Sequence, residues 1–400
     1  MSLSTEAESL RERARARLTA RQDDVLALSH SLHAEPEVAY EEYRSAAKIA
    51  DLMESSGFAV RRGVCELPTA FTATAGSGDL VIGICAEYDA LPGIGHACGH
   101  NVNGAASVAA ALALAEVADE LGVTVKLLGT PAEEYGGGKV DLLRGGAFDD
   151  VAAAMMVHAA PEDGVGMTSL AISSWQVSYT GRAAHAAAMP HRGVNAADAM
   201  TLAQVAIGLQ RQQMLPGGVV HGVVHTAGDA PNVIPARATA SYDCRAESAE
   251  DLRELQRAIR ACFEAGALAT GAELDLRTVG NDYADLRQDV EISRLYTEAA
   301  GLLGRTVAPA TTGMRGGSTD MGNVSHLVPT IHPAIGYGTG DTIMHHPDFT
   351  RYGTGAGADR AVLDGGLAMA WTAIALAADE THRASLLERL ARRPRQAALV

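Results

Sequence analysis

A thiol and an imidazole lie two residues apart in the glycine-punctuated segment from Gly95 to Asn101, as Cys98 and His100. The segment follows the apolar run Leu80 to Cys85, which is predicted to be a buried strand of a parallel sheet. In such sheets ligands bind at the carboxyl ends of the strands. Thiolate and imidazole groups hold borderline-soft divalent metals. A lone Cys-x-His pair is weak evidence, because a buried cysteine is usually a small hydrophobe. The prediction of a metal site therefore depends on the rest of the chain.

A pair of carboxylates follows the next predicted strand. Glu133 and Glu134 come shortly after Val123 to Gly129 and are followed within four residues by Gly136, Gly137 and Gly138. One carboxylate of such a pair can bind a metal while its neighbour takes a proton from water as general base. Taken alone, the same residues also fit a solvated acidic loop.

Further imidazoles complete a donor set. His158 directly follows the predicted strand Val151 to Val157, where it is either a core histidine or a ligand, and His345 and His346 lie near the C-terminus. The five donors expected to converge are Cys98, His100, Glu134, His158 and one of His345 and His346. They are too many for one tetrahedral structural site, and they suit two divalent ions that share a ligand. Glu87 and Asp89 lie beside the Cys98 segment and are expected to orient it.

Composition narrows the class of protein. The 400 residues carry a formal net charge of −16, which argues against nucleic acid or an anionic membrane as a partner. Five widely spaced cysteines do not indicate a disulfide framework, and they favour the cytoplasm. Neither a secretory signal nor a membrane-spanning segment is recognised.

The order of elements predicts an α/β protein with two domains. Helices are expected at 4–32, 43–56, 103–121, 139–147, from 290, and at 354–378, and strands at 80–85, 123–129, 151–157 and 330–337. These form a metal-binding domain, residues 1–171 and 286–400, with a mixed, mostly parallel sheet flanked by helices. Residues 172–285 read strand, helix, strand, strand, helix, strand, which predicts an inserted, lid-like domain of the ferredoxin-like α+β type.

The chain resembles the di-metal amidohydrolases of peptidase family M20, the group of aminoacylase, hippurate hydrolase and indoleacetyl-amino-acid hydrolase. The similarity covers nearly the whole chain. Its matching stretches are Asp89 to Pro92, His96 to Asn101, Pro131 to Glu134, His158, Gly181 to Ala187, Pro190, Gly193 to Ala196, Asn232 to Pro235, Gly317 to Asp320 and the His345 segment. Residues 86–89 and 317–324 look most similar to the branch of p-aminobenzoyl-glutamate hydrolase and β-alanyl-lysine dipeptidase.

The resemblance implies a role for each matching position. Cys98 would bridge two ions, and His100, Glu134, His158 and His345 would complete their ligands; His345 is preferred because the family ligand stands two residues before the proline. Glu133 would be the general base. His185 would act across a homodimer interface on the oxyanion, and Asn232, Arg245, Gly317 and Ser318 would hold the substrate. Glu87 and Asn101 stand where many relatives have aspartate, a departure that concerns metal preference.

The sequence thus predicts a metal-dependent amidohydrolase or metallopeptidase. Metal-activated water, with Glu133 as base, would cleave the amide bond of a small N-acyl amino acid, an aminobenzoyl-glutamate-like compound or a dipeptide. The metals expected are zinc or manganese, with cobalt or nickel as alternatives. The competing hypotheses are a catalytically silent metal-binding homologue with a binding or regulatory role, and a thiol redox or metal-sensing protein built on Cys98. The latter lacks a nearby resolving cysteine.

Overall fold

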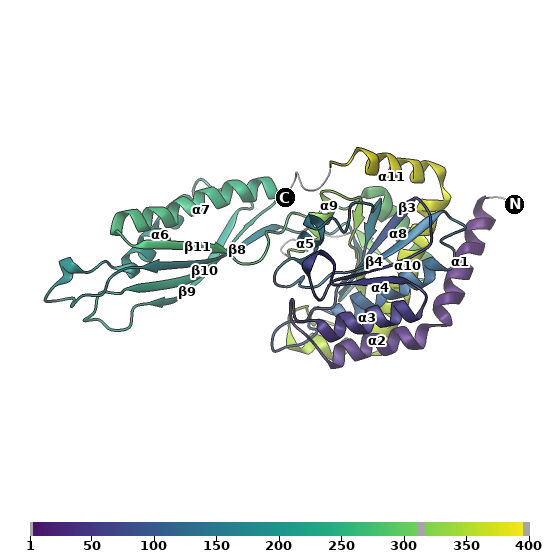
Figure 1. Ribbon diagram of the computed structural model, residues 1–400, viewed down its shortest axis with the longest axis horizontal. Helices are drawn as coiled ribbons and strands as arrows, with labels where there is room; N and C mark the ends of the chain where they lie inside the picture. Colours follow the sequence, from purple (N-terminus) through teal and green to yellow (C-terminus); the bar gives the residue numbers. More distant parts are fainter. Residues whose placement is uncertain (1–2, 310–316, 395–400) are drawn as a thin grey trace. The chain divides into compact units, whose positions relative to one another are not determined.

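The computed structural model describes residues 3–309 and 317–394, which fold into two compact units (Figure 1). The first unit takes in the described residues of 1–168, 286–315 and 319–400, and the second those of 169–285 and 316–318. The expected insertion at 172–285 lies within the second unit, which begins at Ser169 instead of residue 172. The chain is therefore an α/β protein in which one unit interrupts the other.

A mixed sheet is the centre of the first unit. Its order is β1-β2-β4-β3-β5-β13, in which β3, β4, β5 and β13 run parallel. The strands are β1 (Ala59–Arg62), β2 (Phe71–Ala75), β3 (Leu80–Ala86), β4 (Val123–Gly129), β5 (Ala153–Met155) and β13 (Thr330–Ile331). Every residue of β3 is buried, as its unbroken apolar run predicts. The antiparallel edge pair β1 and β2 was not expected, because neither short strand carries a long apolar run.

A smaller sheet contains the candidate ligand His158, and its strands correct two predictions. Its order is β12-β7-β14-β6, formed by β12 (Ala308–Pro309), β7 (Gly164–Val165), β14 (Ala334–Gly336) and β6 (His158–Ala160). The expected strand 151–157 is β5 followed by a break, and His158 begins β6 instead of following a strand. The expected strand 330–337 divides in the same way into β13 and β14. The chain passes from the large sheet to the small one at two places, from β5 to β6 and from β13 to β14, and the paired strands run parallel in both sheets. Because the residues on both sides of each break are largely buried, hydrophobicity alone gives no sign of the break.

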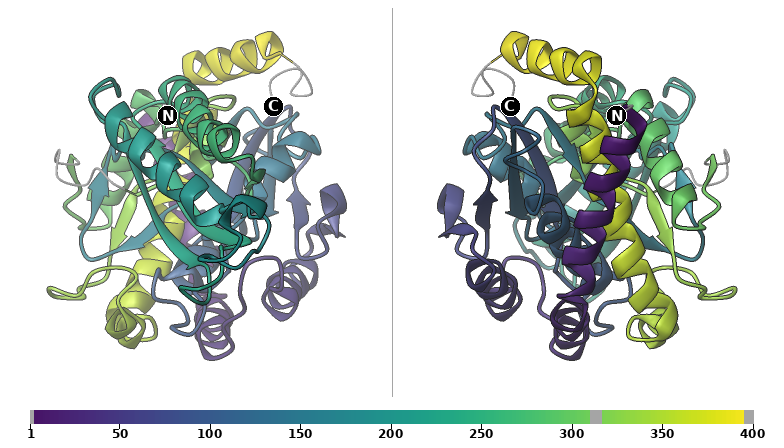
Figure 2. Two further views of the ribbon diagram at one scale, coloured as in Figure 1. Left: turned by 90° about the vertical axis from the view of Figure 1, so that its left-hand side faces the viewer. Right: turned by 90° about the vertical axis from the view of Figure 1, so that its right-hand side faces the viewer.

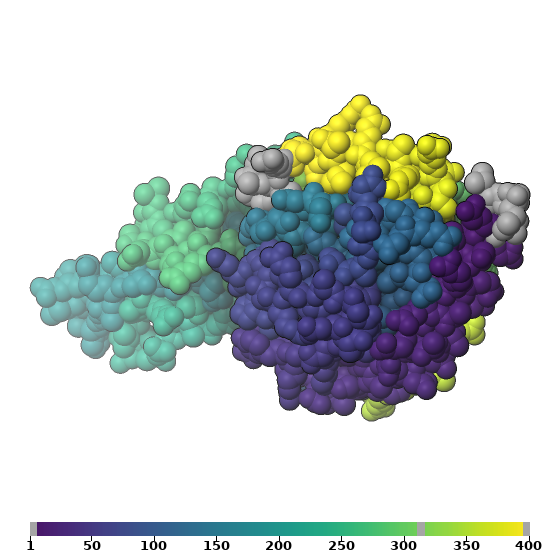
Figure 3. All heavy atoms as spheres, turned by 45° about the vertical axis from the view of Figure 1, so that its right-hand side comes forward, coloured from purple at the N-terminus to yellow at the C-terminus, as the bar shows by residue number. Residues whose placement is uncertain are grey.

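Helices cover the large sheet. They are α1 (Leu3–Thr19), α2 (Gln22–Ala34), α3 (Tyr43–Ser55), α4 (His100–Ala115), α5 (Gly138–Arg144), α8 (Val290–Leu302), α9 (Met321–Ser325), α10 (Ala356–Ala378) and α11 (Glu380–Arg392). The single helix expected at 4–32 is the pair α1 and α2, separated at Ala20 and Arg21, and α11 was not expected. Figure 3 shows the N-terminal part of the chain covering one face of this unit.

Small residues let α4 and α10 pack closely. A Cβ atom added at Gly366 of α10 would lie 2.4 Å from the Cβ of Ala109 on α4. Helix α1 lies alongside α10, where Trp371 Nε1 donates to the main-chain oxygen of Arg11 at 3.2 Å (Figure 2). Within the described residues, α10 is the one helix that is long and apolar enough to cross a membrane, and 78% of that apolar window is buried in the protein. This burial is what a core helix shows.

The second unit is an antiparallel sheet with two helices. Its strands β8 (Ala171–Thr180), β9 (Val219–Ala227), β10 (Arg237–Ala246) and β11 (Glu273–Thr278) have the order β11-β8-β10-β9. Helices α6 (Ala196–Gln210) and α7 (Ala249–Thr270) join them in the predicted split βαβ arrangement. Strand β8 alternates buried and half-buried residues over most of its length, because one face packs on a separate core that contains Trp175 and Phe263.

Candidate metal centre

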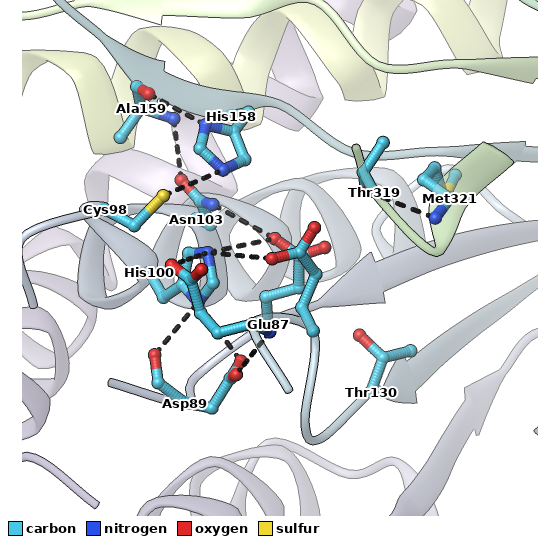
Figure 4. Close-up of polar contacts among 12 residues, drawn as sticks. Glu87, Asp89, Cys98, His100, Asn103, Thr130, His158, Ala159, Thr319 and Met321 are labelled. Atoms are coloured by element: carbon cyan, nitrogen blue, oxygen red, sulfur yellow. Dashed lines mark hydrogen bonds and ion pairs between the residues drawn. The ribbon is translucent and has the colours of Figure 1, made fainter. Parts of the chain in front are cut away.

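The expected donors of the first unit come from loops and element ends around β3, β4 and β6 (Figure 4). Cys98 lies in the turn before α4, and His100 is the first residue of that helix. Gly99 between them has a φ of 76°, a left-handed conformation that suits glycine. A Cβ there would lie 2.4 Å from Ala159, so the turn packs tightly against β6.

Two donor groups share one thiol. Ligand atoms of Cys98, His100 and His158 all lie within 4.8 Å of one another, and so do those of Cys98, Glu134 and His345. Cys98 Sγ is 3.7 Å from His158 Nε2, and His345 Nε2 is 3.5 Å from Glu134 Oε1. Thiolate, imidazole and carboxylate are the ligands that zinc and similar divalent ions use. The arrangement fits two ions with Cys98 between them.

Two ligand atoms of this centre are buried without a hydrogen-bond partner among the described residues. They are Nε2 of His100 and Oε1 of Glu134. A buried polar atom left without a partner costs about 1–3 kcal/mol, so native proteins usually satisfy such atoms. Metal ions would satisfy both. The side chains present therefore fit the metals that the sequence predicts.

Asp89 orients two of the donors. His100 Nδ1 lies 2.9 Å from the main-chain oxygen of Asp89 and 3.1 Å from its Oδ1. Asp89 Oδ2 accepts a bond of 2.9 Å from the main-chain N–H of Glu134. Because oxygen atoms of Asp89 face Nδ1, the neutral ring carries its proton there, which leaves the lone pair of Nε2 available to a metal ion. His158 is set in the same way, with Nδ1 at 2.8 Å from the oxygen of Ala159.

The two neighbouring histidines near the C-terminus have different surroundings. His345 has a φ of 67°, and its main-chain N–H donates to the oxygen of Ala97 at 2.9 Å, beside Cys98. Nδ1 of His346 instead accepts from the N–H of Asp348 at 3.2 Å and caps the short helix Pro347–Tyr352. The geometry brings His345 to the donor groups.

Glu133 lies against the donors in a buried position. Its Oε2 is 3.8 Å from His100 Nε2, and 5% of the residue is exposed. Burial raises the pKa of the Glu133 carboxyl well above its usual range, and the charges of Glu87 and Glu134 raise it further. A raised pKa makes the Glu133 carboxylate a stronger base than a solvent-exposed glutamate.

Sequence reasoning missed two buried residues at this centre, Lys139 and His332. Glu87 is fully buried, and its Oε1 lies 2.6 Å from Nζ of Lys139, which also contacts Asp320. His332 is buried 5.2 Å from His158, measured between ring centroids, and neither of its ring nitrogens has a hydrogen-bond partner among the described residues. His332 directly follows the apolar end of a strand, the signal that singled out His158. Lys139 gave no such signal, because a lysine at the start of a short helix is normally solvated.

The remaining expected residues lie in the second unit. His185 is exposed, and its main chain forms an isolated antiparallel β-bridge with Val233. The main-chain oxygen of the neighbouring Asn232 accepts a bond of 2.9 Å from the N–H of Ala186. His185 Nδ1 accepts from the N–H groups of Ala187 and Ala188 at 3.2 and 3.1 Å. The neutral ring therefore carries its proton on Nε2, as a hydrogen-bond donor.

Arg245 on β10 forms a second group in this unit. Its guanidinium donates to Ser318 Oγ at 3.1 Å, and that hydroxyl donates to the oxygen of Leu170 at 2.7 Å. Gly317 accepts from the N–H of Leu170 at 2.9 Å. The fold thus gathers Arg245, Gly317 and Ser318 and places His185 and Asn232 together on another loop pair.

Comparisons with known proteins give the class. A family model described as a peptidase dimerisation domain matches residues 171–270. The chain is 38% identical over 403 residues to the Xaa-Arg dipeptidase of Mus musculus, covering 97% of this chain and 92% of the relative. It is 36% identical over 267 residues to a p-aminobenzoyl-glutamate hydrolase polypeptide of Escherichia coli, covering 60% of this chain and 55% of that protein.

A solved structure shares the fold. It is the YXEP protein of Bacillus subtilis, described as a dinuclear metal binding peptidase from the M20 family, with a TM-score of 0.68 and 23% identity over 90% of this chain and 99% of that one. The chain is a metal-dependent amidohydrolase. It belongs to the M20 peptidase family, near the p-aminobenzoyl-glutamate hydrolase branch. The family, fold class and reaction class predicted from the sequence are confirmed.

Proposed function

We propose that this protein hydrolyses the amide bond of a small substrate that carries a free carboxylate on its amine side, such as a dipeptide, an N-acyl amino acid or an aminobenzoyl-glutamate-like compound. The observation that carries the proposal is the pair of donor groups that share Cys98, with Glu133 beside them. The relatives support the substrate class, because cleavage of an Xaa-Arg dipeptide or of p-aminobenzoyl-glutamate releases an amino acid.

Two divalent ions would be held by this centre. Cys98, His100 and His158 would hold one, and Cys98, Glu134 and His345 the other. Zinc or manganese fits these ligands, and cobalt or nickel would also bind them. Such ions supply Lewis acidity, which polarises the substrate carbonyl and lowers the pKa of water.

Glu133 would move the protons of the reaction. Its carboxylate takes a proton from the attacking water and later gives it to the nitrogen of the leaving amine. The raised pKa of this buried group suits the first transfer, because a weakly basic carboxylate would be a poor acceptor for a proton of water. Asp89 keeps His100 and the main chain of Glu134 in place during the reaction.

His185 would stabilise the developing oxyanion. Its Nε2–H is a fixed donor, because two main-chain N–H groups hold Nδ1 as an acceptor. We assign this contact to the active site of the partner subunit of a homodimer formed through the second unit. The match of residues 171–270 to a peptidase dimerisation domain supports the dimer.

Arg245 and Asn232 would bind the substrate carboxylate. The planar guanidinium of Arg245 offers two parallel donors, the geometry that a carboxylate accepts. Gly317 and Ser318 lie against it and would shape the same subsite. In a chain with a net charge of −16, a local cation is needed to hold an anionic substrate.

A cytoplasmic location is part of the proposal. All five cysteines are free thiols, which suits a reducing compartment. Burial raises the pKa of the Cys85 thiol to about 12, and that of Cys98 also rises above its usual range in the protein without metal. Cys85 would therefore stay an inert thiol, whereas a metal ligand at Cys98 must lose its proton.

A substrate screen tests the function. The metal-reconstituted protein is assayed with dipeptides, N-acyl amino acids and p-aminobenzoyl-glutamate, each beside the matching carboxamide. We expect metal-dependent release of the amino acid, lost in Glu133→Gln. If the protein binds two ions and cleaves none of these amides, the result would favour a catalytically silent homologue. The relatives argue against that outcome, because they are a dipeptidase and a hydrolase.

A further inference from the structure

A buried lysine lies behind the candidate metal centre. Lys139 on α5 is fully buried, and its Nζ lies 2.6 Å from Glu87 Oε1 and 2.6 Å from Asp320 Oδ1. Asp320 Oδ2 also accepts a bond of 2.9 Å from the main-chain N–H of Lys139. A charge removed from water is tolerated only when such partners surround it. One ammonium therefore ties two carboxylates together.

These two carboxylates belong to a larger acidic group that includes the proposed base. Carboxylate oxygens of Glu87, Glu133 and Asp320 all lie within 4.8 Å of one another. Oxygen donors at such separations are what a divalent cation binds. Here the positive charge beside them comes from the protein itself, because Lys139 contacts both Glu87 and Asp320.

Glu87 also touches the donor groups themselves (Figure 4). Its Oε2 lies 3.7 Å from His100 Nε2, the ligand atom without a hydrogen-bond partner among the described residues. The same carboxylate accepts a bond of 3.2 Å from Asn103 Nδ2, and Asn103 Oδ1 accepts from the N–H of Ala159 at 2.7 Å. A movement of Glu87 would reach both His100 and the strand that carries His158.

We propose that Lys139 is a positioning residue that withholds Glu87 and Asp320 from metal binding and so limits the centre to two ions. The inference rests on the proposed dinuclear function and adds the device that fixes its stoichiometry. With the ammonium in place, Glu87 serves as an acceptor for Asn103. Without it, the carboxylates beside Glu133 lose their compensating charge and form a site for a further divalent ion.

The first test replaces Glu87 by its neutral isostere. The unmodified protein is equilibrated with zinc or manganese and its ions are counted by elemental analysis; about two per chain are expected. If it holds no stoichiometric metal, the proposed function fails before any variant is made. Glu87→Gln should keep about two ions, with a loss of metal affinity of about 10- to 100-fold, the range for a residue that contacts a ligand without binding the ion. Loss of one ion from Glu87→Gln would make Glu87 a ligand and overturn the inference.

The second test removes the ammonium. Lys139→Met should bind an additional ion, and kcat should fall by about 100-fold with KM nearly unchanged, because the added ion would engage the base Glu133. Adding Glu87→Gln to Lys139→Met should return the count to that of the unmodified protein. A lysine that only stabilised the fold would lower the melting temperature and leave the ion count unchanged, and that result would refute the proposal.

A matched control is Lys48→Met. Lys48 on α3 pairs with Glu35 at 3.3 Å, and 25% of its side chain is exposed, so its loss should change neither the ion count nor kcat. If Lys139→Met does not fold, Asp320→Asn is measured in its place. Like Glu87→Gln, Asp320→Asn should keep the ion count of the unmodified protein, and loss of an ion would overturn the proposal.

Discussion

The candidate site residues of the two units are held in different ways. In the first unit His100 is fully buried, and side-chain as well as main-chain oxygens of Asp89 fix its ring. In the second unit His185 is exposed, and neighbouring main-chain groups fix its ring. Buried donors that the protein has already oriented suit a permanently bound metal ion. An exposed donor suits a transient partner such as a substrate. Changes to the proposed metal ligands of the first unit should therefore alter metal content, whereas changes to the candidate residues of the second unit should alter the kinetics and leave metal content unchanged.

The largest effect is expected from the shared thiol. Cys98→Ala should lose both ions, because one ligand serves the two donor groups, and activity should fall by more than the roughly 1,000-fold that loss of a single oxyanion donor costs. Elemental analysis and an amidase assay measure the two losses. Cys85→Ala is the control: this buried thiol on β3 packs in an apolar cluster and should keep both ions. A Cys98→Ala protein with full metal would contradict the shared ligand.

The adjacent carboxylates should separate chemistry from binding. Glu133→Gln should keep its metal and lose about 100- to 10,000-fold in kcat, the range that a positioned general base contributes. Glu134→Gln should instead lose metal, because Oε1 of Glu134 lies 3.5 Å from the His345 ring. Metal analysis of both variants beside their kcat values decides. The reverse pattern would exchange the two assignments.

His185 tests the exposed side of the comparison. His185→Ala should leave metal content and melting temperature unchanged, because its side chain is exposed, and should lower kcat by about 100- to 1,000-fold. Chains of His185→Ala mixed with chains of Glu133→Ala should regain part of the activity, since one site of the mixed dimer would contain both native residues. Each variant alone sets the baseline. Verified heterodimers without any gain would place His185 outside the partner's site.

The smallest effect is expected at the proposed carboxylate contact. Arg245→Ala should raise KM by about 10-fold or more, the cost of one charged hydrogen bond, while metal content stays constant. The carboxamide analogue should show no such change, because it lacks the charge that the guanidinium recognises. Arg237→Ala, an exposed arginine on the same strand β10, is the control. An equal response of acid and carboxamide would make Arg245 a structural residue that holds Ser318.

Local pattern was enough to predict most of the fold. The apolar run before Glu87 and the run from Val123 to Gly129 predict β3 and β4 because both strands lie inside the sheet and are largely buried. The element order of the insertion predicts the sheet of the second unit, since alternating strands and helices of this length pair in few ways. The break between Met155 and His158 was missed, because the chain is buried in both sheets and its hydrophobicity does not change where it passes from one sheet to the other.

The sequence by itself determined the reaction class. Cys98, His100, Glu133, Glu134 and His158 stand near the ends of predicted strands, and their side chains predict a site for two divalent ions. The resemblance of the sequence to the M20 family adds that these ions serve amide hydrolysis. What only the tertiary structure decided is which groups face one another. Lys139 looks like a solvated surface lysine along the chain, yet it is buried between Glu87 and Asp320, which lie 52 and 181 residues away. The reason is physical: a side chain's chemistry is local, whereas the charge that compensates it depends on which distant segments the core brings together.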